Sequence, residues 1–189
     1  MTILQLTEAL IQEGLMLFFV EVIVLKGKIS LIRKVEYVLD YNVTINIAVY
    51  TDANSTFPKP VDENYDYWFP LLNFFITKSD TIEIHCWNEQ IDTINEIQSL
   101  FNDKMEMVKE ENLTIFKLIK SIITIDYLLN NSVNINGELK WFTVNLEKLM
   151  KPVFHSGHWG TEFFIPNVTK EDIVFIKSII PRHAILHEF

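Results

Sequence analysis

The sequence is poor in residues that cross-link or interrupt a chain. The single cysteine, Cys86, excludes an internal disulfide and predicts a reducing compartment, the cytoplasm. Only five glycines and six prolines interrupt the 189 residues, so regular elements should dominate. The first basic residue is Lys26, and the apolar run 15–25 is shorter than the ~20 residues of a membrane helix. We therefore expect neither a signal peptide nor a membrane span.

Basic residues are also scarce. The chain has 16 Lys and Arg against 25 Asp and Glu, a net charge of −9, and no basic run stands out. A nucleic acid or an anionic membrane needs a basic surface to displace its counterions, so both are disfavoured as partners. The acidic balance suits a basic protein or a metal ion, and it also simply keeps an apolar chain soluble.

Short catalytic signatures are missing as well. The sequence contains no H-E-x-x-H, no zinc-finger spacing, no glycine-rich phosphate loop and no nucleophile elbow. Cys86 follows His85 in a predicted strand, where adjacent side chains point to opposite faces, so the two cannot act as a thiolate–imidazole pair. These absences favour a binding protein over an enzyme.

The sequence does contain ample material for a core. Hydrophobic residues make up 49% of the chain and aromatic residues 13%, which predicts one α+β domain over residues 1–189. We expect an antiparallel, mostly meander β-sheet with amphipathic helices packed on one face. The apolar spacing predicts helices at 3–13, 89–111, 113–129 and 170–180. It predicts strands at 15–25, 43–50, 71–77, 81–87, 132–135, 138–144 and in the last residues, and leaves 28–39 open between strand and helix.

An acidic and aromatic stretch lies in the irregular region 51–70. Acids flanked by aromatic rings are typical of an interface that grips a basic partner, although such rings can also fold back over a core. The leading hypothesis is therefore a cytoplasmic protein-binding module, inhibitor-like, immunity-like or regulatory, that presents this surface to a basic protein and needs no cofactor. The expected binding residues are Asp62, Glu63, Tyr65, Asp66, Tyr67 and Trp68.

Histidines gather near the C-terminus and suggest an alternative. Imidazole and carboxylate groups suit zinc or a similar divalent metal, so a metal-dependent hydrolase or a metal-binding protein is the second hypothesis. In a strand, the two tail histidines would lie about 13 Å apart, and only one could join the site. The other interpretation is a glycine-containing connection that leads into the terminal helix. The candidate ligands are His155, His158, Glu162, His183 and His187.

Overall fold

The computed structural model describes residues 16–25, 28–37, 40–51, 57–62 and 64–189, with side chains from residue 40 onwards. Contacts divide the chain into two compact units, Met1–Asp40 and Tyr41–Phe189, which we describe separately. The single domain over residues 1–189 stays a prediction. The helix predicted at 3–13 lies outside the described residues.

The first unit contains an antiparallel pair of strands, β1 (Met16–Leu25) and β2 (Lys28–Tyr37). Their register runs from Met16 opposite Tyr37 to Leu25 opposite Lys28. The segment that the sequence left open is therefore a strand. The strand at 15–25 is confirmed, and it pairs with β2 in a sheet of two strands.

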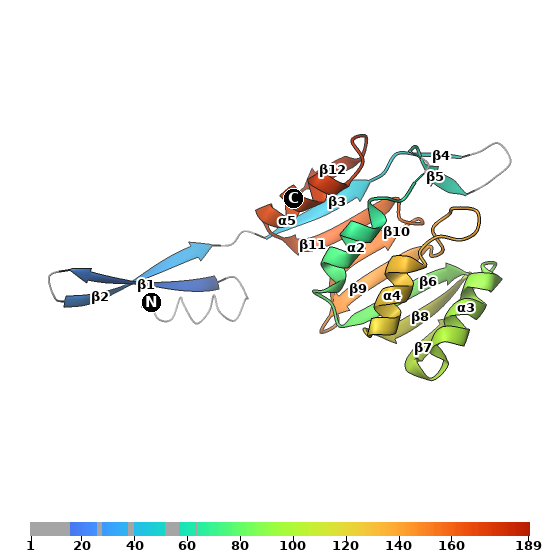
Figure 1. Cartoon of the computed structure of the whole chain (residues 1–189), viewed down its shortest axis with the longest axis horizontal. Coiled ribbons are helices and arrows are strands. Elements are labelled where there is room, and N and C mark those ends of the chain that lie inside the picture. Colours follow the sequence, from blue (N-terminus) through green and yellow to red (C-terminus); the bar gives the residue numbers. More distant parts are fainter. Residues whose placement is uncertain (1–15, 26–27, 38–39, 52–56, 63) are drawn as a thin grey trace. The chain divides into compact units, whose positions relative to one another are not determined.

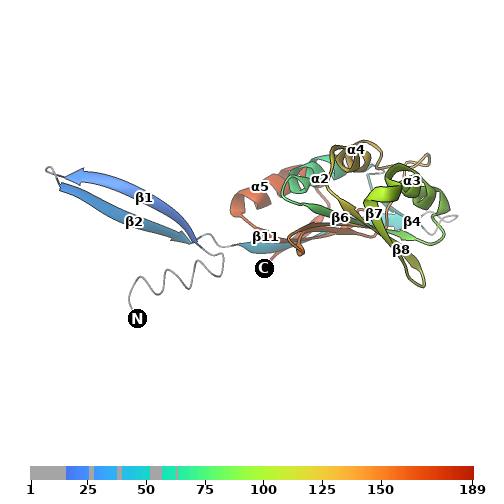
Figure 2. The ribbon, with the colours of Figure 1, turned by 90° about the horizontal axis from the view of Figure 1, so that it is seen from below.

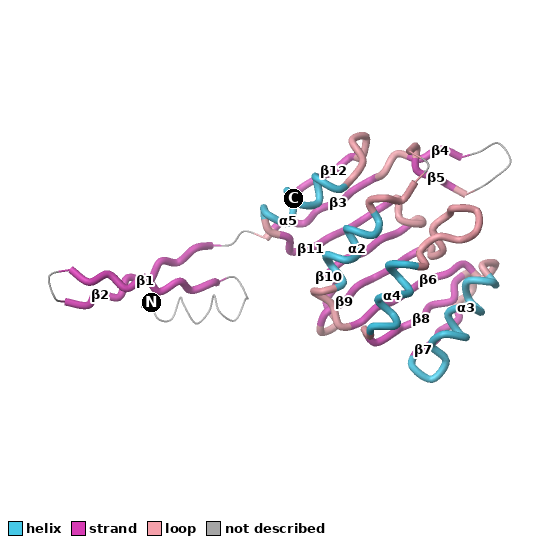
Figure 3. The backbone as a smooth tube through the Cα atoms, viewed as in Figure 1, coloured by secondary structure: helices cyan, strands magenta, loops and turns pink. Residues whose placement is uncertain are grey.

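The second unit is built on an eight-stranded antiparallel sheet with the order β12-β3-β11-β10-β9-β6-β8-β7 (Figures 1 and 3). A separate two-stranded ribbon pairs β4 (Val49–Thr51) with β5 (Pro58–Pro60). The strands of the large sheet are β3 (Tyr41–Asn46), β6 (Thr81–Trp87), β7 (Met105–Lys109), β8 (Leu113–Ile119), β9 (Thr143–Lys148), β10 (Lys151–Gly157), β11 (Glu162–Val168) and β12 (Ile185–Glu188).

The α-helices described in the second unit cover one face of this sheet (Figure 2). They are α2 (Trp68–Ile76), α3 (Ile91–Phe101), α4 (Ile122–Asn130) and α5 (Lys170–Ile179), and a 3-10 turn, η1 (Asn102–Lys104), follows α3. The core lies between the helices and the sheet, because alternate strand residues and one stripe of each helix are buried there. The α+β fold with helices on one face is as the sequence predicts.

Two predicted elements have the wrong type. Residues 71–76 belong to α2 rather than to a strand, because Leu71, Leu72, Phe75 and Ile76 recur at helical spacing and are all buried on one stripe. The helix predicted at 113–129 is wrong in its first half, which is β8, and confirmed in its second half, which is α4 and begins at a capping box between Ser121 and Thr124.

The predicted helix at 89–111 is confirmed only in its first half. It ends at Phe101, and after η1 the chain continues as the edge strand β7. The terminal helix is as predicted: the Thr169 side chain accepts from the backbone N–H of Asp172, whose own carboxylate accepts from the N–H of Thr169. The Asn136-Gly137 turn is also present, but only one bridge, Val133 with Leu139, pairs its arms.

Candidate functional site

The sheet face opposite the helices, called here the open face, carries one continuous row of side chains across all eight strands. Each member lies directly opposite its neighbour in the strand register. On β6 the open-face residues alternate with the buried Ile82, Ile84 and Cys86. From β12 to β7 the row is His187, Thr44, Phe164, His155, Asn145, Glu83, Lys117 and Glu106.

A hydrogen-bonded network occupies the centre of this row. Asn145 Nδ2 donates to Glu83 Oε1 at 3.0 Å, and His85 Nε2 donates to the same oxygen at 2.7 Å. Since its amide nitrogen is used in this way, Asn145 turns its Oδ1 to His155 Nδ1 at 2.7 Å. An amide oxygen can only accept, so the proton of neutral His155 resides on Nδ1 and its Nε2 carries a lone pair.

The network sets the charges of its members. Burial raises the pKa of Glu83, but hydrogen bonds from His85 and Asn145 outweigh it, and the pKa is lower than its ordinary value. Burial lowers the pKa of His155, and the nearby His85 lowers it further. The centre of the open face therefore combines an ionised carboxylate with a neutral imidazole.

The turn between β10 and β11 borders this network. The predicted loop around the histidines is in fact this hairpin, with His155 inside β10. His158, Trp159 and Gly160 all have positive φ, of 47°, 53° and 74°. Left-handed conformations are costly for residues other than glycine, so the surrounding structure holds His158 and Trp159 in place.

An aromatic cluster lies beside the turn. The Phe142 ring is 5.1 Å from that of Trp87 and 5.0 Å from that of Trp159, and Phe57 lies 4.7 Å from Trp159. His158 is 5.4 Å from Phe142 and forms an ion pair with Glu162 at 2.7 Å. The aromatic cluster and the polar network thus meet around the β10–β11 turn.

A pocket of about 480 Å³ opens next to the aromatic cluster. We call it the acidic pocket, because carboxylates line it together with the rings. Its relevant lining residues are Phe57, Trp87, Trp159, Glu89, Asp92 and Glu138.

The structure divides the acidic and aromatic stretch. Tyr67 and Trp68, predicted as surface anchors, are 2% and 1% exposed and belong to the core. Tyr65 is half-buried, and burial raises the pKa of its hydroxyl to about 12. The two aspartates, Asp62 and Asp66, are exposed, whereas Glu63 lies outside the described residues. The rings of Tyr67 and Trp68 therefore do not form an accessible binding surface.

The predicted metal ligands do not gather into one site. His187 and His155 share the row on the open face, but two strands lie between them, which puts them roughly 14 Å apart. His183 lies 3.7 Å from Asp62, and His158 pairs with Glu162. Within the part of the chain that the structure describes, no three His, Cys, Asp or Glu side chains are placed to hold one metal ion.

Candidate nucleophiles lie on the wrong side of the sheet. Cys86 and Ser156 are buried toward the helices, and burial raises the pKa of the Cys86 thiol to about 12. A neutral thiol in an apolar environment is unreactive. The network on the open face can therefore exchange protons and hydrogen bonds, but neither of these side chains can attack a ligand bound there.

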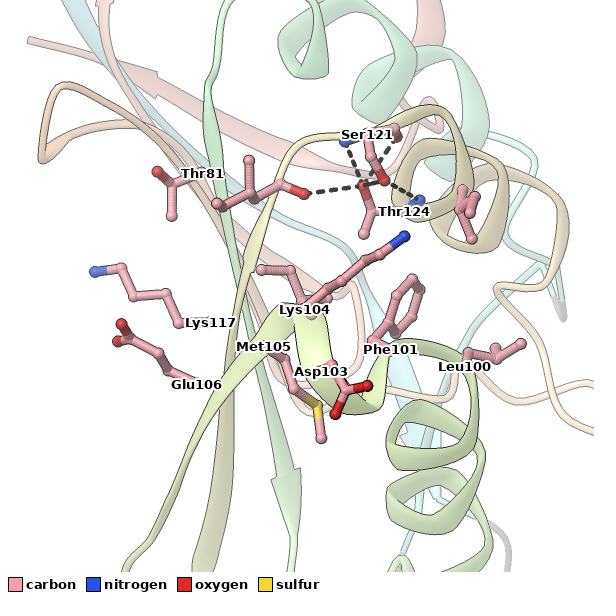
Figure 4. A pocket seen from close by; sticks show the side chains of 13 residues that line it. Thr81, Leu100, Phe101, Asp103, Lys104, Met105, Glu106, Lys117, Ser121 and Thr124 are labelled. Atoms are coloured by element: carbon pink, nitrogen blue, oxygen red, sulfur yellow. Dashed lines mark hydrogen bonds between the residues drawn. The ribbon is translucent and has the colours of Figure 1, made fainter.

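A second pocket, of about 640 Å³, lies at the β7 side of the sheet (Figure 4). Its walls include Leu100, Phe101, Met105 and Ile123. Ser121 and Thr124, shown with their hydrogen bonds in Figure 4, form the cap of α4. The apolar side chains offer hydrophobic contact, and the hydroxyl groups of Ser121 and Thr124 serve the helix cap.

Several residues of the polar network were not predicted from the sequence. The alternation in the segment 81–87 was sufficient to place Glu83, His85 and Trp87 on one strand face. Asn145 carried no such signal, because its role depends on strands that pair across more than 60 residues of chain.

No protein-family model matches this sequence, and comparison with curated proteins and with solved structures finds no significant similarity. Among the described residues, no helix has the length and apolarity needed to cross a membrane.

Proposed function

We propose that the protein is a binding module that uses the open face of its sheet to hold a basic protein partner. The observation that carries the proposal is the open face itself: its row of side chains crosses eight strands, and six of the eight members are half-buried. The helices that cover the sheet lie on the other side. A sheet face of this kind becomes fully buried only when another surface covers it.

The charge of the open face supports a basic partner. Its carboxylates are Glu83, Glu106, Glu147 and Glu162, and Lys117 is the lysine among the paired strand residues there. Lys117 is already 3.6 Å from Glu147, so it offsets only part of the negative charge. Complementary charge accelerates association and selects against acidic competitors. The acidic and aromatic surface of the sequence-based hypothesis is thus retained, with different residues.

Affinity capture from the source cell with two matched variants tests this proposal. Glu106→Lys with Glu162→Lys reverses two exposed carboxylates on the open face, and Asp126→Lys with Glu171→Lys reverses two exposed carboxylates on helices α4 and α5. We expect wild type and the helix variant to capture the same basic protein, and the open-face variant to lose at least about 90% of it. Capture that survives in the open-face variant, or that both variants lose equally, contradicts the proposal.

A further inference from the structure

The acidic pocket has aromatic walls that are fixed before any ligand arrives. Phe142 packs against both Trp87 and Trp159, and Trp159 also contacts Phe57. Trp159 is held in addition by its place in the β10–β11 turn, where its backbone N–H donates to the Phe142 carbonyl at 3.1 Å. A ligand therefore meets ordered rings and does not have to order them, which favours binding.

The charge at the pocket is negative. No Lys, Arg or His is found among the described residues that line it. The carboxylate of Glu138 already has two partners within the protein, since Asn134 Nδ2 donates to it at 3.0 Å and Lys59 Nζ lies 3.8 Å away. Glu89 and Asp92 are exposed, and neither has a hydrogen bond or ion pair within the described part of the chain.

The N-terminus of α3 opposes the binding of a cation in the acidic pocket. Asp92 lies in the first turn of α3, and a helix N-terminus carries about half a positive charge. The charges of Glu89 and Asp92 together exceed this several-fold, so the potential at the pocket remains negative.

From these features we infer that the acidic pocket binds the cationic end of an arginine or lysine side chain. A guanidinium or ammonium group is attracted to the face of an indole ring and gains a second attraction from carboxylates beside it. Rings and unpaired acids occur together at this pocket, whereas the larger pocket at the β7 side mixes acids with Lys104 and Lys117.

This inference rests on the proposed function in one respect, namely that the partner supplies the cation. Trp87 is shared between the open face and the pocket wall, so a protein that covers the open face has the pocket at its border. A basic side chain placed there would act as an anchor, because a preformed pocket is where interface binding energy concentrates.

Titration of the full chain with N-acetyl-arginine amide tests the inference without the partner. The probe is followed through the NMR signals of the indole N–H groups of the four tryptophans. We expect the signals of Trp87 and Trp159 to shift, with a dissociation constant on the order of millimolar, while those of the buried Trp68 and Trp141 stay in place. N-acetyl-lysine amide should behave similarly, and the neutral isostere N-acetyl-citrulline amide should bind at least tenfold more weakly.

Matched variants separate a pocket from general attraction to an acidic protein. Glu89→Gln with Asp92→Asn should weaken arginine binding at least tenfold, and Asp126→Asn with Glu171→Gln, which removes the same charge elsewhere, should leave it within twofold. Equal binding of citrulline, equal losses in the two variants, or no shift at tens of millimolar overturns the inference. None of these outcomes determines the result of the capture experiment, and a failed capture experiment does not determine the result of the titration. Failure of this inference can therefore be distinguished from failure of the proposed function.

Discussion

At the scale of single residues, the structure separates aromatic side chains that composition cannot tell apart. The hydroxyl of Tyr67 donates to the Gly160 carbonyl at 3.0 Å, and Trp68 Nε1 donates to the Leu128 carbonyl at 3.3 Å. Their neighbour Phe69 is 48% exposed. Three consecutive rings therefore include two core residues and one surface residue, although all three follow the same acidic stretch.

We expect Tyr67→Ala or Trp68→Ala to lower the free energy of unfolding by about 3–5 kcal/mol, as is usual when a large buried aromatic residue is removed. Phe69→Ala should cost less than about 1 kcal/mol, because about half of the Phe69 side chain is already exposed to water in the folded protein. Urea denaturation followed by circular dichroism measures all three. A Phe69 variant as unstable as the other two would contradict the placement of Phe69 on the surface, and mild losses at Tyr67 and Trp68 would contradict their assignment to the core.

At the scale of elements, turns with positive φ position the candidate site. Gly160, in the β10–β11 turn, and Gly137, in the turn that leads to Glu138, have φ values of 74° and 73°. Their surroundings differ, since a Cβ added to Gly160 would lie 2.9 Å from Leu139 Cδ2, whereas one added to Gly137 would meet nothing within 4 Å.

Gly160→Ala and Gly137→Ala therefore form a matched pair. Both variants incur the cost of about 1–2 kcal/mol for a left-handed alanine. Only Gly160→Ala also crowds the core, so we expect it to be less stable than Gly137→Ala by a further 1–3 kcal/mol or so. The difference between their urea midpoints measures the effect of crowding on stability. Equal midpoints would contradict the prediction, because they would show that the surroundings of Gly160 accommodate the added methyl group without loss of stability.

The elements also show what sequence patterns can settle. The terminal helix was predictable because Thr169 and Asp172 form a cap and Pro181 follows. The strand at residues 113–119 was not predictable, because the apolar side chains of this segment fit a helix and a strand nearly equally well. Pairing with β6 and β7 decides in favour of a strand, and β6 lies outside the local window.

At the scale of the whole molecule, the site is an outcome of topology. Glu83, Asn145 and His155 come from three strands, and no local pattern places them in one row. The sequence supported the fold class and the candidacy of His155, His158 and Glu162 as chemically capable groups. It could not show that His155 has an asparagine partner, because that contact depends on the β9–β10 register.

The network also predicts how global stability depends on pH. The pKa of His155 is lower in the folded protein than its ordinary value of 6.5, so the unfolded chain takes up a proton more readily. Stability should therefore fall as the pH drops below about 6.5. The lowered pKa of Glu83 adds a second loss below its ordinary value of 4.5.

Urea unfolding between pH 7.5 and 5 tests the contribution of His155. The slope of unfolding free energy against pH should flatten in His155→Gln, whose amide can still donate to Asn145. His187→Gln, which changes an exposed histidine in the same row, is the matched control. The groups facing His155, namely His85, His158, Glu162 and Glu83, remain in both variants. Identical slopes in wild type and His155→Gln would contradict the interpretation.

The position of β3 inside the sheet has a consequence for synthesis on the ribosome. β3 pairs with β11 and β12, so its first partner begins at Glu162, more than a hundred residues later in the chain. At ~5–20 residues per second, β3 waits roughly 6–25 seconds after it is made before that partner exists. During this time a strand with an apolar face, formed by Val43 and Ile45, has two unpaired edges. Such a segment makes the nascent chain a natural client for chaperones that shield unpaired strands.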